Sequence, residues 1–86
     1  MKASHILVET LEQAQKLSEQ ATTENFSVLA GQYSQCPSSA RGGDLGEFGP
    51  GQMVRPFEDG VSTLEVGQIS QPVQTSFGYH LIHRTG

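Results

Sequence analysis

The chain has 86 residues and a mass of 9.3 kDa, which is enough for one small domain over residues 1–86. Five Lys and Arg against nine Asp and Glu give a formal net charge of −4. The bases are scattered, which argues against nucleic acid or an anionic membrane as partner. No apolar run approaches the ~20 residues that span a bilayer, and we expect no signal or transit peptide. The single cysteine excludes an internal disulfide and fits a reducing compartment, so we expect a cytoplasmic protein. The sequence gives no reason to expect an oligomer, so we expect a monomer.

Residues 2–9 are predicted to form the first strand. Ala3, His5 and Leu7 alternate with Ser4, Ile6 and Val8, so both faces carry apolar groups. We therefore expect a strand that is covered on both sides, with His5 among apolar neighbours.

Two helices are predicted next, the first over about residues 11–23 and the second over 26–34. Thr10 can cap the first helix and Asn25 the second. The second helix has one apolar face at the spacing i, i+3, i+4, i+7, made by Phe26, Leu29, Ala30 and Tyr33.

The second half of the chain is glycine-rich at first and then regular. Residues 38–52 hold five glycines, which predict turns and a short strand at 44–48. Pro56 suits the first turn of a third helix over 55–63, in which Gly60 is unfavourable. Strands are expected near 71–75 and over 79–84.

This order of elements predicts an α+β fold with a small, antiparallel sheet. The last strand is apolar enough to be central. If it pairs with the first strand, His5 and His80 lie side by side.

A polar constellation of His5, Cys36, Asp44, Thr75 and His80 leaves four chemical interpretations open. A zinc site is disfavoured because His80 and His83 point to opposite faces of a strand. A thiol hydrolase is disfavoured because no signature surrounds Cys36. A redox thiol is disfavoured because Cys36 has no resolving partner. We therefore expect neither a metal nor a cofactor.

The fourth interpretation is a binding pocket with an apolar slot beside the histidines and the cysteine. Leu45, Met53 and Phe57 could form the walls of this slot. Each of them could equally be an ordinary core residue, and a lone cysteine is often a small buried hydrophobe. The residues by themselves thus predict a small α+β domain that could bind peptides.

Five blocks of sequence, in order from residue 4 to residue 84, resemble the parvulin family of peptidyl-prolyl cis/trans isomerases. The blocks are Ser4-His5-Ile6-Leu7-Val8; Tyr33-Ser34-Gln35-Cys36-Pro37-Ser38 with Arg41-Gly42-Gly43-Asp44-Leu45-Gly46; Gly51-Gln52-Met53-Val54 with Pro56-Phe57-Glu58; Val66-Gly67-Gln68-Ile69-Ser70 with Pro72-Val73; and Thr75-Ser76-Phe77-Gly78-Tyr79-His80. The resemblance implies a four-stranded antiparallel sheet surrounded by about four short helices. It also implies catalysis of cis/trans exchange at X–Pro bonds of peptides and unfolded proteins.

The resemblance also assigns site residues. It implies that His5, Cys36, Thr75 and His80 form the catalytic group. It implies that the substrate-binding residues are Leu45, Gln52, Met53, Phe57 and Phe77, with Met53 and Phe57 around the proline ring, Gln52 at the rim and Phe77 over the mouth.

One departure bears on the substrate. Family members that prefer phosphorylated Ser/Thr–Pro share a basic loop after the first strand, where this chain has Glu9-Thr10-Leu11-Glu12. A phosphate would meet acid there, so we expect no phosphate preference.

The expected mechanism is rotation without bond cleavage, because an apolar pocket favours the less polar twisted amide over the planar one. We expect Cys36 to act as a polarisable group rather than as a covalent nucleophile, since some family members have Asp at this position. The alternative function is a proline-peptide-binding or holdase module with little catalytic activity.

Overall fold

The computed structural model describes the backbone of residues 1–86 and every side chain except that of Ser38. It contains four strands, three α-helices and one 3-10 helix. In chain order these are β1 (Lys2–Val8), α1 (Leu11–Gln20), α2 (Phe26–Tyr33), the 3-10 helix η1 (Pro37–Arg41), β2 (Asp44–Glu47), α3 (Arg55–Ser62), β3 (Val73–Thr75) and β4 (Gly78–Arg84).

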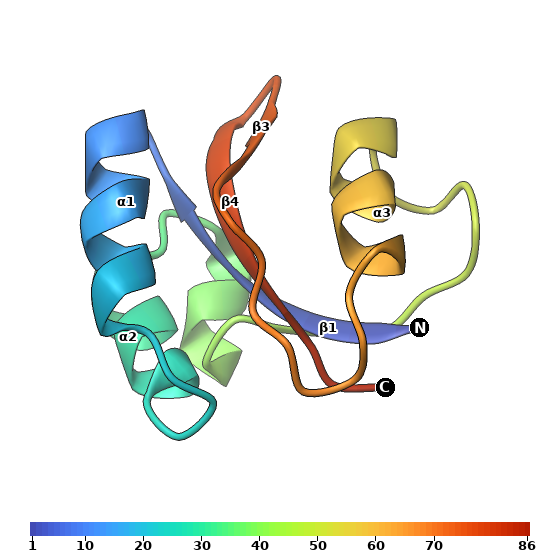
Figure 1. Cartoon of the computed structure of the whole chain (residues 1–86), viewed down its shortest axis with the longest axis horizontal. Helices are drawn as coiled ribbons and strands as arrows, with labels where there is room; N and C mark the ends of the chain where they lie inside the picture. The colour runs from blue at the N-terminus through green and yellow to red at the C-terminus, as the bar shows by residue number, and fades with distance from the viewer.

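The strands form one antiparallel sheet in the order β2-β1-β4-β3, which confirms the predicted α+β fold. Helices α1 and α2 lie on one face of the sheet and α3 on the other (Figure 1). The last strand, β4, is central, as its apolar character predicts, and it pairs with β1 as the second central strand. None of the helices in the described part of the chain is long and apolar enough to cross a membrane.

Each face of the sheet has its own hydrophobic core, because the side chains of β1 and β4 alternate between the faces. The core between the sheet and helices α1 and α2 includes Ile6, Leu17, Phe26 and Leu81. The core between the sheet and α3 consists of Ala3, Phe48, Phe57, Val61 and Ile82. The central strands are therefore covered on both sides, as predicted for β1.

Helix α1 ends at Gln20, three residues before its predicted end. The cause is a pair of reciprocal bonds: Thr22 N–H donates to Asn25 Oδ1 at 2.7 Å, and Asn25 N–H donates to Thr22 Oγ1 at 3.2 Å. Asn25 is thus occupied and makes no side-chain cap on α2, contrary to the prediction. Thr10 does cap α1, since its Oγ1 accepts the Gln13 N–H at 3.2 Å.

Two further expectations about helices need correction. Tyr33, predicted on the inward face of α2, is 51% exposed because it lies in the last turn, past the other inward residues. Gly60, expected only to weaken α3, also lies where the helix packs closely on the sheet. A Cβ atom at Gly60 would lie 3.0 Å from Val73 Cγ2 and 3.2 Å from Ile82 Cδ1.

Candidate active site

Two histidines meet at the centre of the sheet. Strands β1 and β4 pair with His5 opposite Ile82 and Leu7 opposite His80. His5 and His80 are therefore diagonal neighbours on the face covered by α3. Their Nδ1 atoms are 2.9 Å apart, and their rings stack with centroids 5.1 Å apart and planes at 17°. The predicted juxtaposition of the two histidines is confirmed.

Thr75 on β3 extends this pair into a network. Its Oγ1 lies 2.7 Å from Nε2 of His80 and accepts the backbone N–H of Phe77 at 3.1 Å. A hydroxyl has one proton to donate and two lone pairs to accept with. Thr75 is thus bonded on both sides, and it ties the turn that carries Phe77 to the histidine pair.

The protons of this network are linked. A bond between two Nδ1 atoms needs one protonated nitrogen and one bare nitrogen. If Thr75 donates to a bare Nε2 of His80, then His80 donates from Nδ1 to His5. If His80 donates to Thr75 instead, then His5 donates to His80. In either direction the bond excludes a state in which both rings are doubly protonated.

Burial keeps the two rings neutral. Removal from water, together with the neighbouring His80, lowers the pKa of His5 from 6.5 to about 4. Removal from water also lowers the pKa of His80 from 6.5 to about 4. Phe57 on α3 is one source of this apolar setting. Its ring meets His5 edge-on at 5.6 Å and His80 at 5.2 Å between centroids.

A cavity of about 470 Å³ opens beside the pair. Its walls come from β1, β2, β4 and α3, from the segment between α2 and η1 with the start of η1, from the loop before α3, and from the turn between β3 and β4. The described residues that line it are His5, Leu7, Gln35, Cys36, Pro37, Leu45, Gln52, Met53, Val54, Phe57, Phe77 and His80. Lys, Arg, Asp and Glu are absent from this set, so the cavity is apolar with a few uncharged polar groups.

Eight of the nine site residues expected from the sequence thus line one cavity, and the ninth, Thr75, is bonded to His80 behind it. Sequence reasoning missed four lining residues: Leu7, Gln35, Pro37 and Val54. The signal for Leu7 was present, because alternation puts it on the same face of β1 as His5. The other three lie in loops or at a helix start, where the sequence has no such period.

Cys36 lies in the segment that follows α2 and is half-buried. Its backbone N–H donates to Ser34 Oγ at 3.4 Å. The thiol shares the cavity with both histidines, so it can influence the electrostatics at a bound peptide bond.

The loop between β2 and α3 forms the opposite wall. Gln52 turns back and accepts the N–H of Gly49 with its side-chain oxygen at 2.7 Å. Glu58 on α3 accepts the N–H of Gly51 at 2.7 Å. These two bonds shape the loop that carries Met53 into the cavity.

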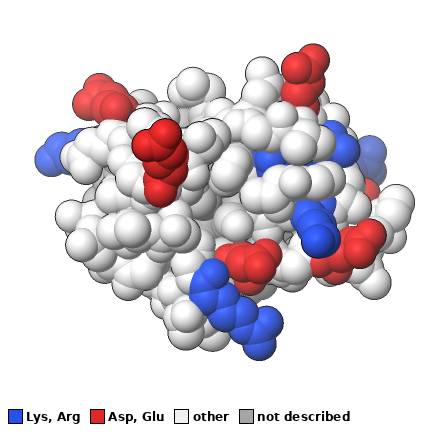
Figure 2. Space-filling view, turned by 90° about the horizontal axis from the view of Figure 1, so that it is seen from below, with Lys and Arg blue, Asp and Glu red and all other residues white. Residues whose placement is uncertain are grey.

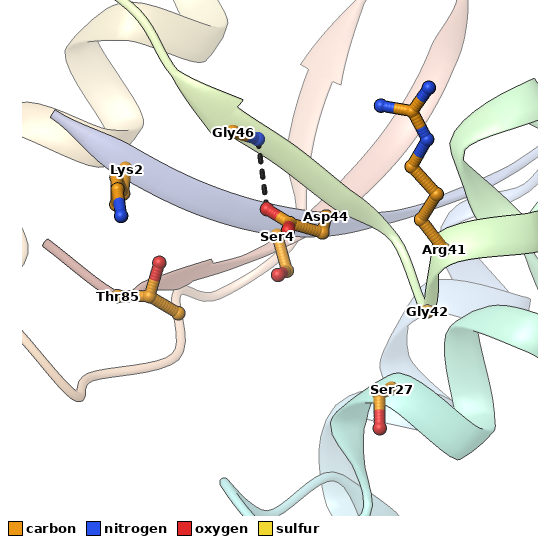
Figure 3. Close-up of a pocket in the computed structure, with 8 residues that line it drawn as sticks. All are labelled: Lys2, Ser4, Ser27, Arg41, Gly42, Asp44, Gly46 and Thr85. Atoms are coloured by element: carbon orange, nitrogen blue, oxygen red, sulfur yellow. Dashed lines mark hydrogen bonds between the residues drawn. The ribbon is translucent and has the colours of Figure 1, made fainter.

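Asp44 does not belong to this site, contrary to the sequence-based grouping. It starts β2, is exposed, and accepts the N–H of Gly46 with its own carboxylate at 2.8 Å. It lines a separate hollow with Lys2, Ser4 and Arg41 (Figure 3). That hollow mixes both charges and lacks an apolar floor, so it does not suit a proline ring.

His83 is also separate from the pair. It lies on the opposite face of β4, where its ring packs against Phe26 at 5.4 Å between centroids. Among the side chains that the structure describes, no three or more His, Cys, Asp or Glu residues are grouped so that they could hold a metal ion.

Comparison with known proteins agrees with this geometry. Residues 5–86 match the family described as the rotamase, PPIC-type PPIase domain. The chain therefore belongs to the PPIC-type, or parvulin, family of peptidyl-prolyl cis/trans isomerases, as the five sequence blocks indicated.

Two relatives and one solved structure illustrate the match. The chain is 51% identical to foldase protein PrsA 4 of Bacillus cereus over 99% of its own length and 31% of the relative. It is 46% identical to the peptidyl-prolyl cis-trans isomerase Pin1 of Digitalis lanata, over 91% of this chain and 68% of that protein. A crystal structure of peptidylprolyl isomerase PrsA from Bacillus cereus superposes with a TM-score of 0.94 at 50% identity, covering 100% of this chain and 34% of that one. The chain thus spans about a third of the length of its foldase relatives.

Proposed function

We propose that the chain catalyses cis/trans exchange at X–Pro bonds of peptides and unfolded proteins, without a preference for a phosphorylated residue before the proline. The observation that carries this proposal is the uncharged cavity whose apolar wall, formed by Leu45, Met53 and Phe57, adjoins the neutral histidine pair. Membership in the isomerase family supports it.

The proposed mechanism needs no bond cleavage. The uncatalysed barrier of about 18–20 kcal/mol arises from amide resonance, which is lost when the bond is twisted. The twisted form is less polar than the planar one, so an apolar cavity favours it. Met53 and Phe57 hold the proline ring while the carbonyl side turns. Every 1.36 kcal/mol removed from the barrier raises the rate tenfold.

Within this mechanism the polar network acts on orientation and charge. The hydrogen-bonded side chains beside the rotating bond stay uncharged; they are those of His5, His80 and Thr75. Cys36 presents a polarisable sulfur to the carbonyl and does not attack it. Some family members have Asp at this position, and a carboxylate is a poor nucleophile toward an amide.

The charges around the site support the proposal on phosphate. Glu9 follows β1 directly and Glu12 lies in the first turn of α1, where it pairs with the exposed Lys16 at 3.5 Å. Arg55, which follows the cavity residue Val54, lies 3.9 Å from Asp59. A phosphate carries nearly two negative charges and needs cations that face it.

Nucleic acid and membrane surfaces are not proposed as partners. Figure 2 shows basic and acidic side chains interspersed over the underside of the molecule, without a basic patch on that face. A nucleic-acid site needs such a patch. The cytoplasmic location and the monomeric state stay predictions.

A second candidate is a binding or holdase module that uses the same cavity with little catalysis. Apolar surface at the mouth favours it, since Phe77 is 67% and Val54 is 39% exposed. Such a surface could hold unfolded chain, and the name foldase of the PrsA relatives agrees with a role in folding.

The experiment is exchange NMR on a series of Xaa–Pro peptides that includes Leu–Pro and phosphoserine–Pro, with micromolar protein. We expect faster exchange of the Leu–Pro peptide and no advantage for the phosphorylated one. If the phosphorylated peptide exchanges more than about tenfold faster than the Leu–Pro peptide, a difference of ~1.4 kcal/mol in the barrier, the proposed lack of phosphate preference is contradicted. Peptide-induced shifts without faster exchange would favour the holdase.

A further inference from the structure

Ser34 occupies the junction between helix α2 and the central strand. It is the C-cap of α2, with an extended backbone at φ −69° and ψ 135°, and it is half-buried. Its Oγ accepts two backbone N–H groups, from Leu7 at 3.0 Å and from Cys36 at 3.4 Å. One oxygen thus connects β1 with the segment that carries the cavity thiol.

Strand β1 needs this acceptor because β2 covers only part of its edge. The described pairing with β2 joins Lys2 to Glu47 and Ser4 to Asp44, and the His5 N–H donates to Gly43 O at 2.9 Å. The next N–H on this edge belongs to Leu7, and Ser34 accepts it.

Gln35 bonds the same edge of β1 where β2 no longer reaches. Its N–H donates to the Leu7 carbonyl at 2.8 Å. The Ser34 side chain and the Gln35 backbone therefore supply the acceptor and donor that a longer β2 would offer, and a buried backbone group is seldom left without a partner.

The same oxygen is bonded to the backbone of the residue that carries the thiol. Cys36 is two residues after Ser34, and Leu7 is two residues after His5 on the same face of β1. Cys36, Leu7 and His5 all line the cavity, whereas Ser34 is not one of the described lining residues. Ser34 can therefore affect the site only through its neighbours.

We propose that Ser34 is a positioning residue, which fixes the place of the Cys36 thiol in the cavity that it shares with the histidine pair, by accepting the Leu7 and Cys36 N–H groups through one hydroxyl oxygen. This role rests on the proposed isomerase function. It predicts that the loss of Ser34 Oγ lowers turnover more than it weakens peptide binding, because Met53 and Phe57 are on other elements.

The test compares Ser34→Ala with Ser34→Thr, which keeps a hydroxyl, and with Ser27→Ala, an exposed serine on the same helix. We expect Ser34→Ala to lower kcat for a Leu–Pro peptide about five- to tenfold, as for one net hydrogen bond, with KM changed less than about twofold. Ser34→Thr should restore most of kcat, and Ser27→Ala should match the unsubstituted chain.

Two readouts do not depend on catalysis. In Ser34→Ala the Leu7 amide should exchange its hydrogen faster, and iodoacetamide should alkylate Cys36 faster, because the segment is released. If the unsubstituted chain fails to accelerate isomerisation, the proposed function fails, while these two readouts still test the hold of Ser34 on Cys36.

The proposal is overturned if Ser34→Ala keeps kcat within about twofold, if its loss is in KM, or if Ser34→Thr does not rescue it. If Ser34→Ala does not fold, Ser34→Cys takes its place in the kinetic and amide-exchange measurements, since sulfur is a weak acceptor of similar size. A Ser34→Cys protein with unchanged kcat and Leu7 protection would contradict the proposal equally.

Discussion

His5 and His80 are neutral at physiological pH because of where they lie. Each is 4% exposed, on the face of the sheet that α3 covers. The first cause of the low pKa of both rings is burial, with the partner ring as a lesser cause for His5. Uncharged histidines keep the cavity weakly polar, and such surroundings favour the twisted amide, which is less polar than the planar one.

This lowered pKa makes stability depend on pH in a defined window. Above pH 6.5 both histidines are neutral in the folded and unfolded chain, and their full contribution is present. Between pH 6.5 and about 4 the unfolded chain binds protons that the folded chain does not, so the free energy of unfolding falls as pH falls.

Urea unfolding between pH 7.5 and 5 measures this effect before most carboxylates titrate. We expect a fall of up to about 1.4 kcal/mol per pH unit for each histidine. His83→Gln should keep most of the slope, because His83 is only half-buried. A flat free energy over this range would contradict the assignment of two buried neutral rings.

At Cys36 the non-covalent mechanism makes a prediction of its own. Cys36→Asp should keep kcat/KM within about tenfold, or ~1.4 kcal/mol of barrier, since a carboxylate also places electron-rich atoms beside the carbonyl without attacking it. An obligatory nucleophile would leave almost no catalysis in that variant. Exchange NMR decides between the two, with thermal unfolding as a check that the variant is folded.

Helix α3 packs closely on the sheet at Gly60. A Cβ at Gly60 would lie 3.0 Å from Val73 Cγ2 and 3.2 Å from Ile82 Cδ1. Gly31, inside α2, has its nearest contact at 3.8 Å, from the Ser39 carbonyl oxygen. A methyl group therefore has room at Gly31 but meets close contacts at Gly60.

Alanine at these two positions should have opposite effects. Gly31→Ala should raise the free energy of unfolding by about 0.5–1 kcal/mol through helix propensity. In Gly60→Ala the same gain is outweighed by overpacking, which costs about 1–3 kcal/mol, so we expect net destabilisation. Chemical denaturation of both variants measures this, and a Gly60→Ala protein as stable as Gly31→Ala would refute the close packing.

Helix α3 also holds the loop that carries Met53, through the bond from Gly51 N–H to Glu58. Glu58→Ala should raise the Kd of a Leu–Pro peptide about three- to tenfold, because the loop loses a bond to a charged acceptor at a partly exposed site. Glu58→Gln keeps an acceptor oxygen and should bind nearly normally. Asp59→Asn, next to it and exposed, is the matched control. Equal affinity of all three variants in NMR titrations would contradict the role of Glu58.

The sequence predicts features that depend on the spacing of residues within one element and on local chemistry. Alternation places His5 and His80 on definite faces of β1 and β4, and they become neighbours once these strands pair. Thr10 is recognisable as a cap from the residues next to it. The resemblance to the parvulin family then supplies the pocket residues, which the cavity brings together.

Features that depend on contacts between distant segments cannot be predicted from the sequence. Asn25 looks like a cap, but its side chain is taken by the turn before α2. Gly60 looks like a defect until Val73 and Ile82 are placed against it. The bonds of Ser34 and Glu58 join segments that no periodic pattern relates, so only the folded structure shows them.

The central claim is that the apolar wall of the cavity lowers the barrier to rotation. Exchange NMR on a Leu–Pro peptide tests it with the unsubstituted chain, Met53→Ala and Val28→Ala. Met53 is half-buried in the cavity wall, and Val28 is 57% exposed on α2. Phe57→Ala is less suitable, because emptying its core position costs about 3–5 kcal/mol of stability.

We expect clear acceleration by the unsubstituted chain at micromolar concentration and an equal rate with Val28→Ala. Folded Met53→Ala should be about tenfold slower, which corresponds to ~1.4 kcal/mol of barrier. No acceleration by the unsubstituted chain, or the same rate for Met53→Ala and Val28→Ala, would contradict a role of the apolar wall in catalysis.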